Sequence, residues 1–222
     1  MEKSRVTYPK FRLRQTQFVS KGEKSGILAS VNPFLPDSPS DSELPDFSPE
    51  ASRPPEPAPI IDLHSDSYFM GEALRQAQRA YAAEEVPVGA VITHKGRIIA
   101  RAFNQVEQLK DATAHAEMLA ITQAESVLGD WRLNECELYV TKEPCPMCAG
   151  AIVHVRLKRV IFGCGDPRGG GAGGLFNIVQ SPSLNHRCEV TREVRLEECR
   201  GILRAFFQEK RARRETEADS PS

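Results

Sequence analysis

Residues 136–163 read CELYVTKEPCPMCAGAIVHVRLKRVIFG, and this stretch decides the fold class. Its first part, 136–141, is rich in residues that favour strands. Residues 146–155 form an apolar helical segment with proline at its opening turn, a position where the missing N–H is harmless. A second apolar run, at 159–163, is typical of a strand buried in a sheet core. The stretch therefore predicts a strand, a helix and a second strand, as in an α/β layered domain.

The flanking sequence continues this alternation of strands and helices. Apolar residues recur at helical spacing on both sides of the stretch, and two β-rich runs flank a Lys95-Gly96 turn. Such alternation predicts a sheet in the middle with helices on both faces. The expected elements are a helix at 69–84, a hairpin of 86–92 with 98–103, a helix from Thr113 as N-cap to Ala124, and a helix at 196–211.

Composition separates the first 66 residues from the rest. Residues 33–59 hold nine of the 16 prolines, six carboxylates and few large apolar side chains, so they cannot bury enough surface to offset the entropy of ordering. The first 24 residues carry seven Lys and Arg, which fits an organelle presequence, an arm that touches nucleic acid, or a tail without a fold. We expect a disordered proline-rich extension over 1–66, one folded domain over 67–214 and a disordered tail over 215–222.

Charge and cysteine usage exclude several classes of protein. The chain has 29 basic and 30 acidic side chains, which excludes a uniformly basic nucleic-acid coat. No apolar run approaches the roughly 18 residues that cross a bilayer. The even count of six cysteines would allow disulfides, but an adequate core and the lack of an export signal favour a reducing compartment. Four cysteines are therefore expected to be small buried hydrophobic residues: Cys136, Cys164, Cys188 and Cys199.

Residues of the types that bind metals gather at two points in the domain. Cys145 and Cys148 lie three residues apart at the start of a predicted helix, so both sulfurs project to one side. The positive end of that helix favours the thiolate form, which is the form that binds metal. His115 lies at the start of the preceding predicted helix, and a strand between the two helices can bring both starts to one sheet edge. One nitrogen and two sulfurs suit zinc.

The number of ligands indicates what the site does. Structural zinc sites are closed by four protein ligands, whereas catalytic sites leave one position for water. Only three well-spaced ligands are found, and Glu117 follows His115 closely enough to reach a metal-bound water without binding the metal. Two other interpretations remain: a redox pair of the two cysteines, or a structural site completed by Cys164, Cys188 or His154.

The pattern of His-x-Glu followed by Pro-Cys-x-x-Cys resembles the signature of the zinc nucleobase deaminases. The likeness spans about residues 67–212 and is closest to the bacterial-type tRNA-specific adenosine deaminases of the cytidine/deoxycytidylate deaminase superfamily. The zinc signature alone also fits guanine, cytosine, cytidine and riboflavin-pathway enzymes, so a free nucleobase or nucleoside deaminase is the alternative. Segments similar to the tRNA enzymes are Glu85–Val91, Thr113–Glu117, Glu143–Ala151 and Asn185–Arg187.

This resemblance implies a three-layer α-β-α, cytidine-deaminase-like fold with a central mixed sheet. It also implies one zinc per subunit, held by His115, Cys145 and Cys148, and hydrolytic deamination of adenosine to inosine at the wobble position of tRNA. Glu117 would be the acid and base of that reaction. The implied partners are a tRNA anticodon loop and a second copy of the chain, with no membrane. The implied location is the bacterial cytoplasm, or an organelle stroma or matrix if the N-terminus is a presequence.

Three further residues are implied as substrate contacts by their positions in the family. Asn104 has an amide that can donate and accept toward a purine edge, the alternative being a solvated loop residue. Asp166 lies in a glycine-rich loop, 163–174, which lacks the Gly-Lys-Ser/Thr ending of a phosphate-binding P-loop and is expected to be flexible. Phe207 adjoins Phe206 near a basic helix end and is the expected stacking partner of a base, the alternative being a core role.

Overall fold

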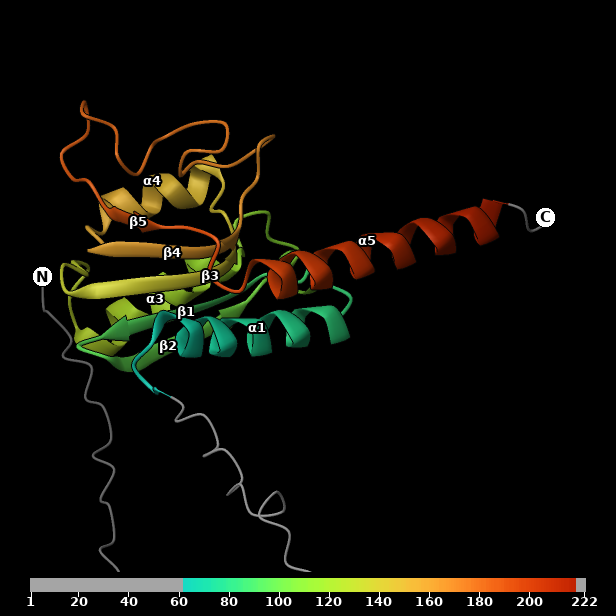
Figure 1. Ribbon diagram of the computed structural model, residues 1–222, viewed down its shortest axis with the longest axis horizontal. Coiled ribbons are helices and arrows are strands. Elements are labelled where there is room, and N and C mark those ends of the chain that lie inside the picture. Colours follow the sequence, from blue (N-terminus) through green and yellow to red (C-terminus); the bar gives the residue numbers. More distant parts are fainter. Residues whose placement is uncertain (1–61, 219–222) are drawn as a thin grey trace, which may run out of the picture. The chain divides into compact units, whose positions relative to one another are not determined.

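The structure is a computed structural model that describes residues 62–218, so most of the predicted extension and the last four residues lie outside the described residues. The domain that it describes alternates helices with strands (Figure 1). In chain order the elements are α1 (Asp66–Ala82), β1 (Gly89–His94), β2 (Arg97–Phe103), α2 (Val106–Leu109), α3 (Ala116–Leu128), β3 (Cys136–Lys142), α4 (Pro146–His154), β4 (Arg159–Cys164), β5 (Glu189–Thr191) and α5 (Leu196–Ala218).

The five strands form one mixed sheet in the order β2-β1-β3-β4-β5. β1 pairs antiparallel with both β2 and β3, whereas β3, β4 and β5 run parallel to one another. The strand–helix–strand unit predicted from 136–163 is the central parallel pair, with α4 as its crossover. In open sheets of this kind, ligands bind beyond the carboxyl ends of the parallel strands.

Helices cover both faces of the sheet, which confirms the predicted three-layer fold. Successive side chains of a strand point to opposite faces. Tyr139 and Ile161 therefore pack with α1 and α5, whereas Val140 and Val160 pack with α3 and α4. Figure 1 shows α1 and α5 side by side on their face.

Glycine allows close packing where helices cross the strands. A Cβ atom at Gly89 would lie 2.1 Å from the carbonyl oxygen of Ala73 in α1. A Cβ atom at Gly163 would lie 2.2 Å from Cys199 Sγ in α5. Both distances are below van der Waals contact, so the two helices could not pack this closely against a larger residue.

The start of α1 is joined to the sheet by one carboxylate. Asp66 accepts two hydrogen bonds from the Arg159 guanidinium, at 2.9 and 2.6 Å, and a third from the Tyr139 hydroxyl at 3.0 Å. Ser65 is the N-cap of α1. The folded domain therefore begins before residue 67, the predicted boundary, because Ser65 and Asp66 already take part in it.

Two other element ends differ from the prediction. α3 begins at Ala116 with His115 as its N-cap, and the Thr113 hydroxyl instead donates to the Asp111 carboxylate in the preceding turn. α5 continues to Ala218, although a tail was predicted from residue 215. The short elements α2 and β5 were not predicted.

The cysteines behave as predicted for a chain without disulfides. All six are free, and Cys136, Cys164, Cys188 and Cys199 are buried. Burial raises the pKa of Cys136 to about 11 and of Cys188 and Cys199 to about 12, so these thiols stay protonated at neutral pH. Among residues 62–218, no helix is long and apolar enough to cross a membrane.

Candidate active site

α3 and α4 bring three metal-binding side chains together at their N-termini. His115 and Cys145 are the N-caps of α3 and α4, both with an extended backbone, and Cys148 lies in the first turn of α4. His115 Nδ1 is 3.7 Å from Cys145 Sγ and 3.5 Å from Cys148 Sγ. The three ligand atoms lie within 4.8 Å of one another. The structure thus brings together the three residues that the sequence pattern indicated.

The geometry of this cluster fits zinc. A tetrahedral ion with Zn–N of about 2.0 Å and Zn–S of about 2.3 Å separates nitrogen from sulfur by about 3.5 Å. Within the described part of the chain, no fourth His, Cys, Asp or Glu joins the cluster. Cys164 and Cys188 donate to backbone carbonyls, and the His154 ring stacks on Trp131. A structural site completed by one of these three residues is therefore excluded.

The three ligands are strongly coupled to one another. A hydrogen bond from the Cys148 thiol, together with a hydrogen bond from His115, lowers the pKa of Cys145 to about 3. Hydrogen bonding to Cys145 raises the pKa of both Cys148 and His115. Cys145 is thus a thiolate at neutral pH, which is the form that binds metal. A metal ion would displace the protons of the other two ligands, so its affinity falls in acid.

Glu117 lies beside the cluster without belonging to it. It occupies the first turn of α3, and its side chain is almost completely buried, with 3% of its surface exposed. Burial raises the pKa of this carboxyl above its usual value. A raised pKa makes the protonated form of this carboxyl easier to reach, which suits a group that must both take up and release a proton.

A cavity of about 300 Å³ opens onto these residues. This volume is at the lower end of the range for small-molecule sites. It is lined by Glu85, Val86, Val88, Asn104, Val106, Glu107, His115, Glu117, Lys142, Glu143 and Cys145.

Asn104 is buried in the wall of this cavity. Its Nδ2 donates to Glu85 Oε2 at 3.1 Å, and Glu85 Oε1 accepts the backbone N–H of Gln108 at 2.7 Å. The interpretation of Asn104 as a solvated loop residue is therefore excluded. Glu85 fixes the orientation of the Asn104 amide, because one Glu85 oxygen accepts from Asn104 while the Gln108 backbone N–H holds the other.

The glycine-rich loop is attached to the turn that carries Cys145. Glu143 is buried, and its carboxylate accepts the backbone N–H groups of Asp166 at 2.7 Å, Ala172 at 3.0 Å and Gly174 at 2.8 Å. A Cβ atom at Gly170 would lie 2.2 Å from the carboxyl carbon of Glu143. Gly170 and Gly174 therefore allow the loop to pack closely around the buried Glu143 carboxylate. The number of glycines had instead predicted a flexible loop.

The structure does not place Asp166 in the cavity wall. Its carboxylate instead forms an ion pair with Lys142, with 2.5 Å between Oδ2 and Nζ. Lys142 lines the cavity, although nothing in the sequence pattern had marked it. Glu85 and Glu143 were also missed individually, but both lie in segments that resemble the tRNA enzymes. His186, from the Asn-His-Arg triplet, bonds through Nε2 to the Leu157 carbonyl at 2.7 Å.

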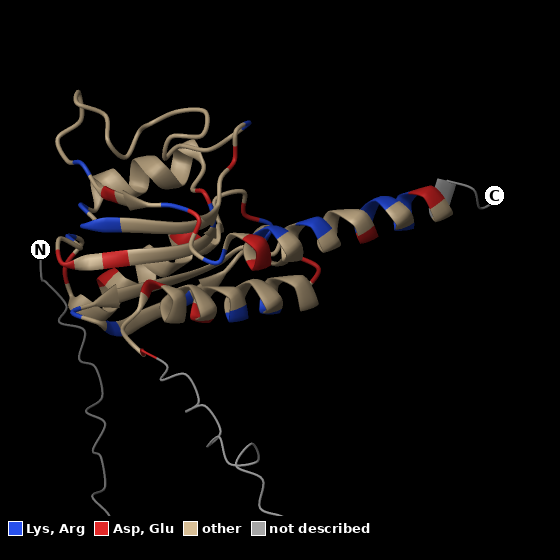
Figure 2. Cartoon of the chain, viewed as in Figure 1, with Lys and Arg blue, Asp and Glu red and all other residues tan. Residues whose placement is uncertain are grey.

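A second, larger groove adjoins the cavity. Its volume is about 930 Å³, and it shares Val86 and Glu107 with the first. Phe207 lines this groove with 45% of its surface exposed, whereas Phe206 is 6% exposed and packs against Tyr81. The groove also contains three basic residues of α5: Lys210, Arg211 and Arg214. Figure 2 shows basic side chains recurring along this helix.

Comparison with known sequences gives consistent matches. A model of the cytidine and deoxycytidylate deaminase zinc-binding region matches residues 63–164. The chain is 49% identical over 152 residues to the tRNA-specific adenosine deaminase of Bacillus subtilis, covering 68% of this chain and 94% of the relative. It is 50% identical over 144 residues to the tRNA-specific adenosine deaminase of Aquifex aeolicus, covering 65% and 95%.

Solved structures have the same fold. One comes from a study of A-to-I editing by tRNA deaminases at the wobble position of transfer RNA, with 41% identity and a TM-score of 0.60. The match covers 62% of this chain and 99% of that one. A guanine deaminase from Nitrosomonas europaea is 23% identical, with a TM-score of 0.58, over 66% of this chain and 86% of that one. At that identity the second match indicates a shared fold only.

Proposed function

Because the chain belongs to the tRNA-specific adenosine deaminases, we propose that it hydrolyses adenosine to inosine at the wobble position of tRNA. The observation that carries this proposal is the group of three ligands with buried Glu117 beside it. Three protein ligands leave a zinc ion one position for water, as in catalytic sites.

The reaction requires proton transfers that Glu117 is placed to perform. His115, Cys145 and Cys148 would hold the zinc ion, which would supply the chemistry of lowering the pKa of the attacking water to near neutral. Glu117 takes one proton of the attacking water and gives it to the ring nitrogen beside the attacked carbon. It then takes the second proton, from the new hydroxyl group, and gives it to the departing amino group. Water adds to the carbon that bears the amino group, the C–N bond breaks, and ammonia leaves.

We propose that Asn104 binds the purine edge in the cavity. Its buried amide is held by Glu85, so it is oriented before the substrate arrives. This preorganisation reduces the entropy lost on binding. Asp166 then acts through its contact with Lys142, because its carboxylate does not line the cavity.

We propose that the groove beside the cavity holds the nucleotides that flank the target adenosine. Phe207 offers an exposed ring on which a base can stack, while Lys210, Arg211 and Arg214 offer positive charge to phosphates. RNA loops with unstacked bases are commonly recognised by aromatic and basic side chains together. This arrangement is local, which agrees with the near-neutral charge of the whole chain.

We also propose that the chain forms a homodimer and works in the cytoplasm. Met147 in the first turn of α4 is 37% exposed, and Leu175 and Phe176 in the segment between β4 and β5 are each 51% exposed. Exposed apolar side chains mark a protein interface where they form one contiguous patch, and a dimer through this face would bury these three. The bacterial source of the relatives supports the location. Light scattering after gel filtration would test the mass, and a monomer at micromolar concentration would contradict the dimer.

The activity is tested by incubating the zinc-loaded chain with an anticodon stem-loop RNA that carries adenosine at the wobble position. Inosine measured by mass spectrometry is the expected product. A matched stem-loop with the adenosine moved one nucleotide should remain unchanged. Free guanine is the second substrate offered, and turnover of guanine without turnover of RNA would identify a nucleobase deaminase instead.

A further inference from the structure

We propose that Lys142 binds a phosphate group of the RNA at the rim of the deamination cavity, and that Asp166 is its positioning residue. The proposal rests on the proposed function and adds a substrate contact to it.

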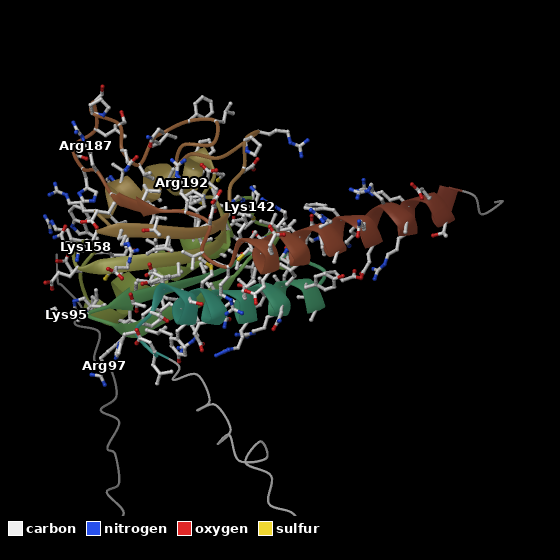
Figure 3. The ribbon with its side chains drawn as sticks, viewed as in Figure 1. Lys95, Arg97, Lys142, Lys158, Arg187 and Arg192 are labelled. Carbon is white, nitrogen blue, oxygen red and sulfur yellow. The ribbon has the colours of Figure 1, made fainter. Side chains whose placement is uncertain are left out.

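Lys142 lies in the wall of the deamination cavity, beside the metal-binding residues. It ends β3 three residues before Cys145 and lines the cavity together with His115 and Glu117. Its side chain is 30% exposed, so solvent reaches part of it. Figure 3 shows Lys142 and Lys158 at opposite ends of the sheet, so the two lysines differ in their distance from the site.

The wall of the cavity carries more acidic than basic side chains. Among the described residues that line the cavity, Lys142 is the only Lys or Arg, whereas four are glutamates: Glu85, Glu107, Glu117 and Glu143. A nucleotide whose base enters the cavity brings phosphates on both sides of its ribose. Acidic walls repel these phosphates, and a lysine at the rim offsets that repulsion.

The ammonium group is held in place but retains binding capacity. Lys142 Nζ lies 2.5 Å from Asp166 Oδ2, and Asp166 Oδ1 accepts the backbone N–H groups of Arg168 at 3.0 Å and Gly169 at 3.2 Å. The Asp166 N–H donates to Glu143 at 2.7 Å. Asp166 is therefore fixed on several sides. A lysine has three N–H donors, and within residues 62–218 only Asp166 accepts from this one, which leaves two donors for a phosphate.

A double-mutant cycle tests the contact. Wild type, Lys142→Met, Asp166→Asn and the double variant are assayed on the stem-loop RNA across a range of salt concentrations. We expect Lys142→Met to raise KM about tenfold, with little change in kcat, since an ammonium–phosphate hydrogen bond is lost. The slope of log(kcat/KM) against log[salt] should become shallower by about 0.7, the value for one phosphate contact on single-stranded RNA. Lys142→Arg should keep the wild-type slope.

The cycle separates a phosphate contact from a purely structural ion pair. If Lys142 binds phosphate and Asp166 positions it, Lys142→Met still raises KM and makes the salt slope shallower in the Asp166→Asn background, but by a smaller factor than in the wild type. If Lys142 only neutralises Asp166, the double variant has the KM and slope of Asp166→Asn alone, and the proposal is overturned. Lys158→Met is the matched control and should leave both quantities unchanged.

The same assays distinguish this proposal from the proposed function. Wild type that forms no inosine contradicts the proposed function and this inference together. Wild type that forms inosine, with Lys142→Met unchanged in KM and salt slope, contradicts this inference alone. Zinc content and thermal unfolding of each variant are measured in parallel, and Lys142→Gln replaces Lys142→Met if the methionine variant does not fold.

Discussion

Glu117→Gln isolates the proton transfers from the rest of the site. Glutamine has the same length as glutamate and still accepts hydrogen bonds through one oxygen, but it cannot carry a proton at neutral pH. Glu117 is not among the three grouped ligands, so the variant should bind one zinc as the wild type does. The loss expected is therefore a loss of kcat alone.

The size of that loss depends on how many proton transfers Glu117 performs. General acid–base catalysis contributes about 10²- to 10⁴-fold for one proton transfer, and Glu117 serves more than one, so we expect kcat to fall by about 10⁴-fold. The two other buried glutamates of the cavity wall are already engaged by N–H donors. Both oxygens of Glu85 accept N–H donors, as do both oxygens of Glu143.

The assay is single-turnover inosine formation with enzyme in excess over the stem-loop RNA, together with zinc content by mass spectrometry. Glu125→Gln, near the other end of α3 and outside the cavity wall, is the matched control and should keep the wild-type rate. The weakest acid–base contribution is about 100-fold, so the variant should keep at most roughly 1% of the wild-type rate. A Glu117→Gln protein that binds stoichiometric zinc and exceeds this rate would contradict the role of Glu117 in proton transfer.

Three other changes test the metal site and the domain boundary. Cys148→Ala should lose zinc and activity and unfold at a lower temperature in calorimetry, because zinc joins α3 to α4; stoichiometric zinc would mean a different ligand set. Asp66→Asn weakens the pair with Arg159, so the free energy of unfolding in urea should fall by about 2 kcal/mol, and an unchanged urea midpoint would contradict this. Deleting residues 1–61 should keep kcat at saturating RNA within a small factor, with a KM increase that depends on salt; loss of zinc would place the segment in the catalytic domain.

The sequence alone determined the layers and the chemical core of the site. The alternation of strand and helix patterns around 136–163 predicted the α/β sandwich, and the structure confirms it. His115, Cys145 and Cys148 could be identified because each lies at a helix start, and a helix start follows from residues within one turn of it. Spacing along the chain therefore marked the three residues as candidate ligands, and the resemblance to the zinc deaminases assigned them as one zinc site.

Only the tertiary structure decided which polar groups surround that core. Glu143 meets Ala172 and Gly174 across 29 and 31 residues, and Asn104 meets Glu85 across 19. A carboxylate accepts any nearby donor, so its residue type does not specify its partner. Likewise, Phe206 is buried and Phe207 is exposed because the Phe206 ring is the one that packs against Tyr81 of α1. Such partners depend on how distant segments pack, and packing is a property of the whole fold that no local spacing encodes.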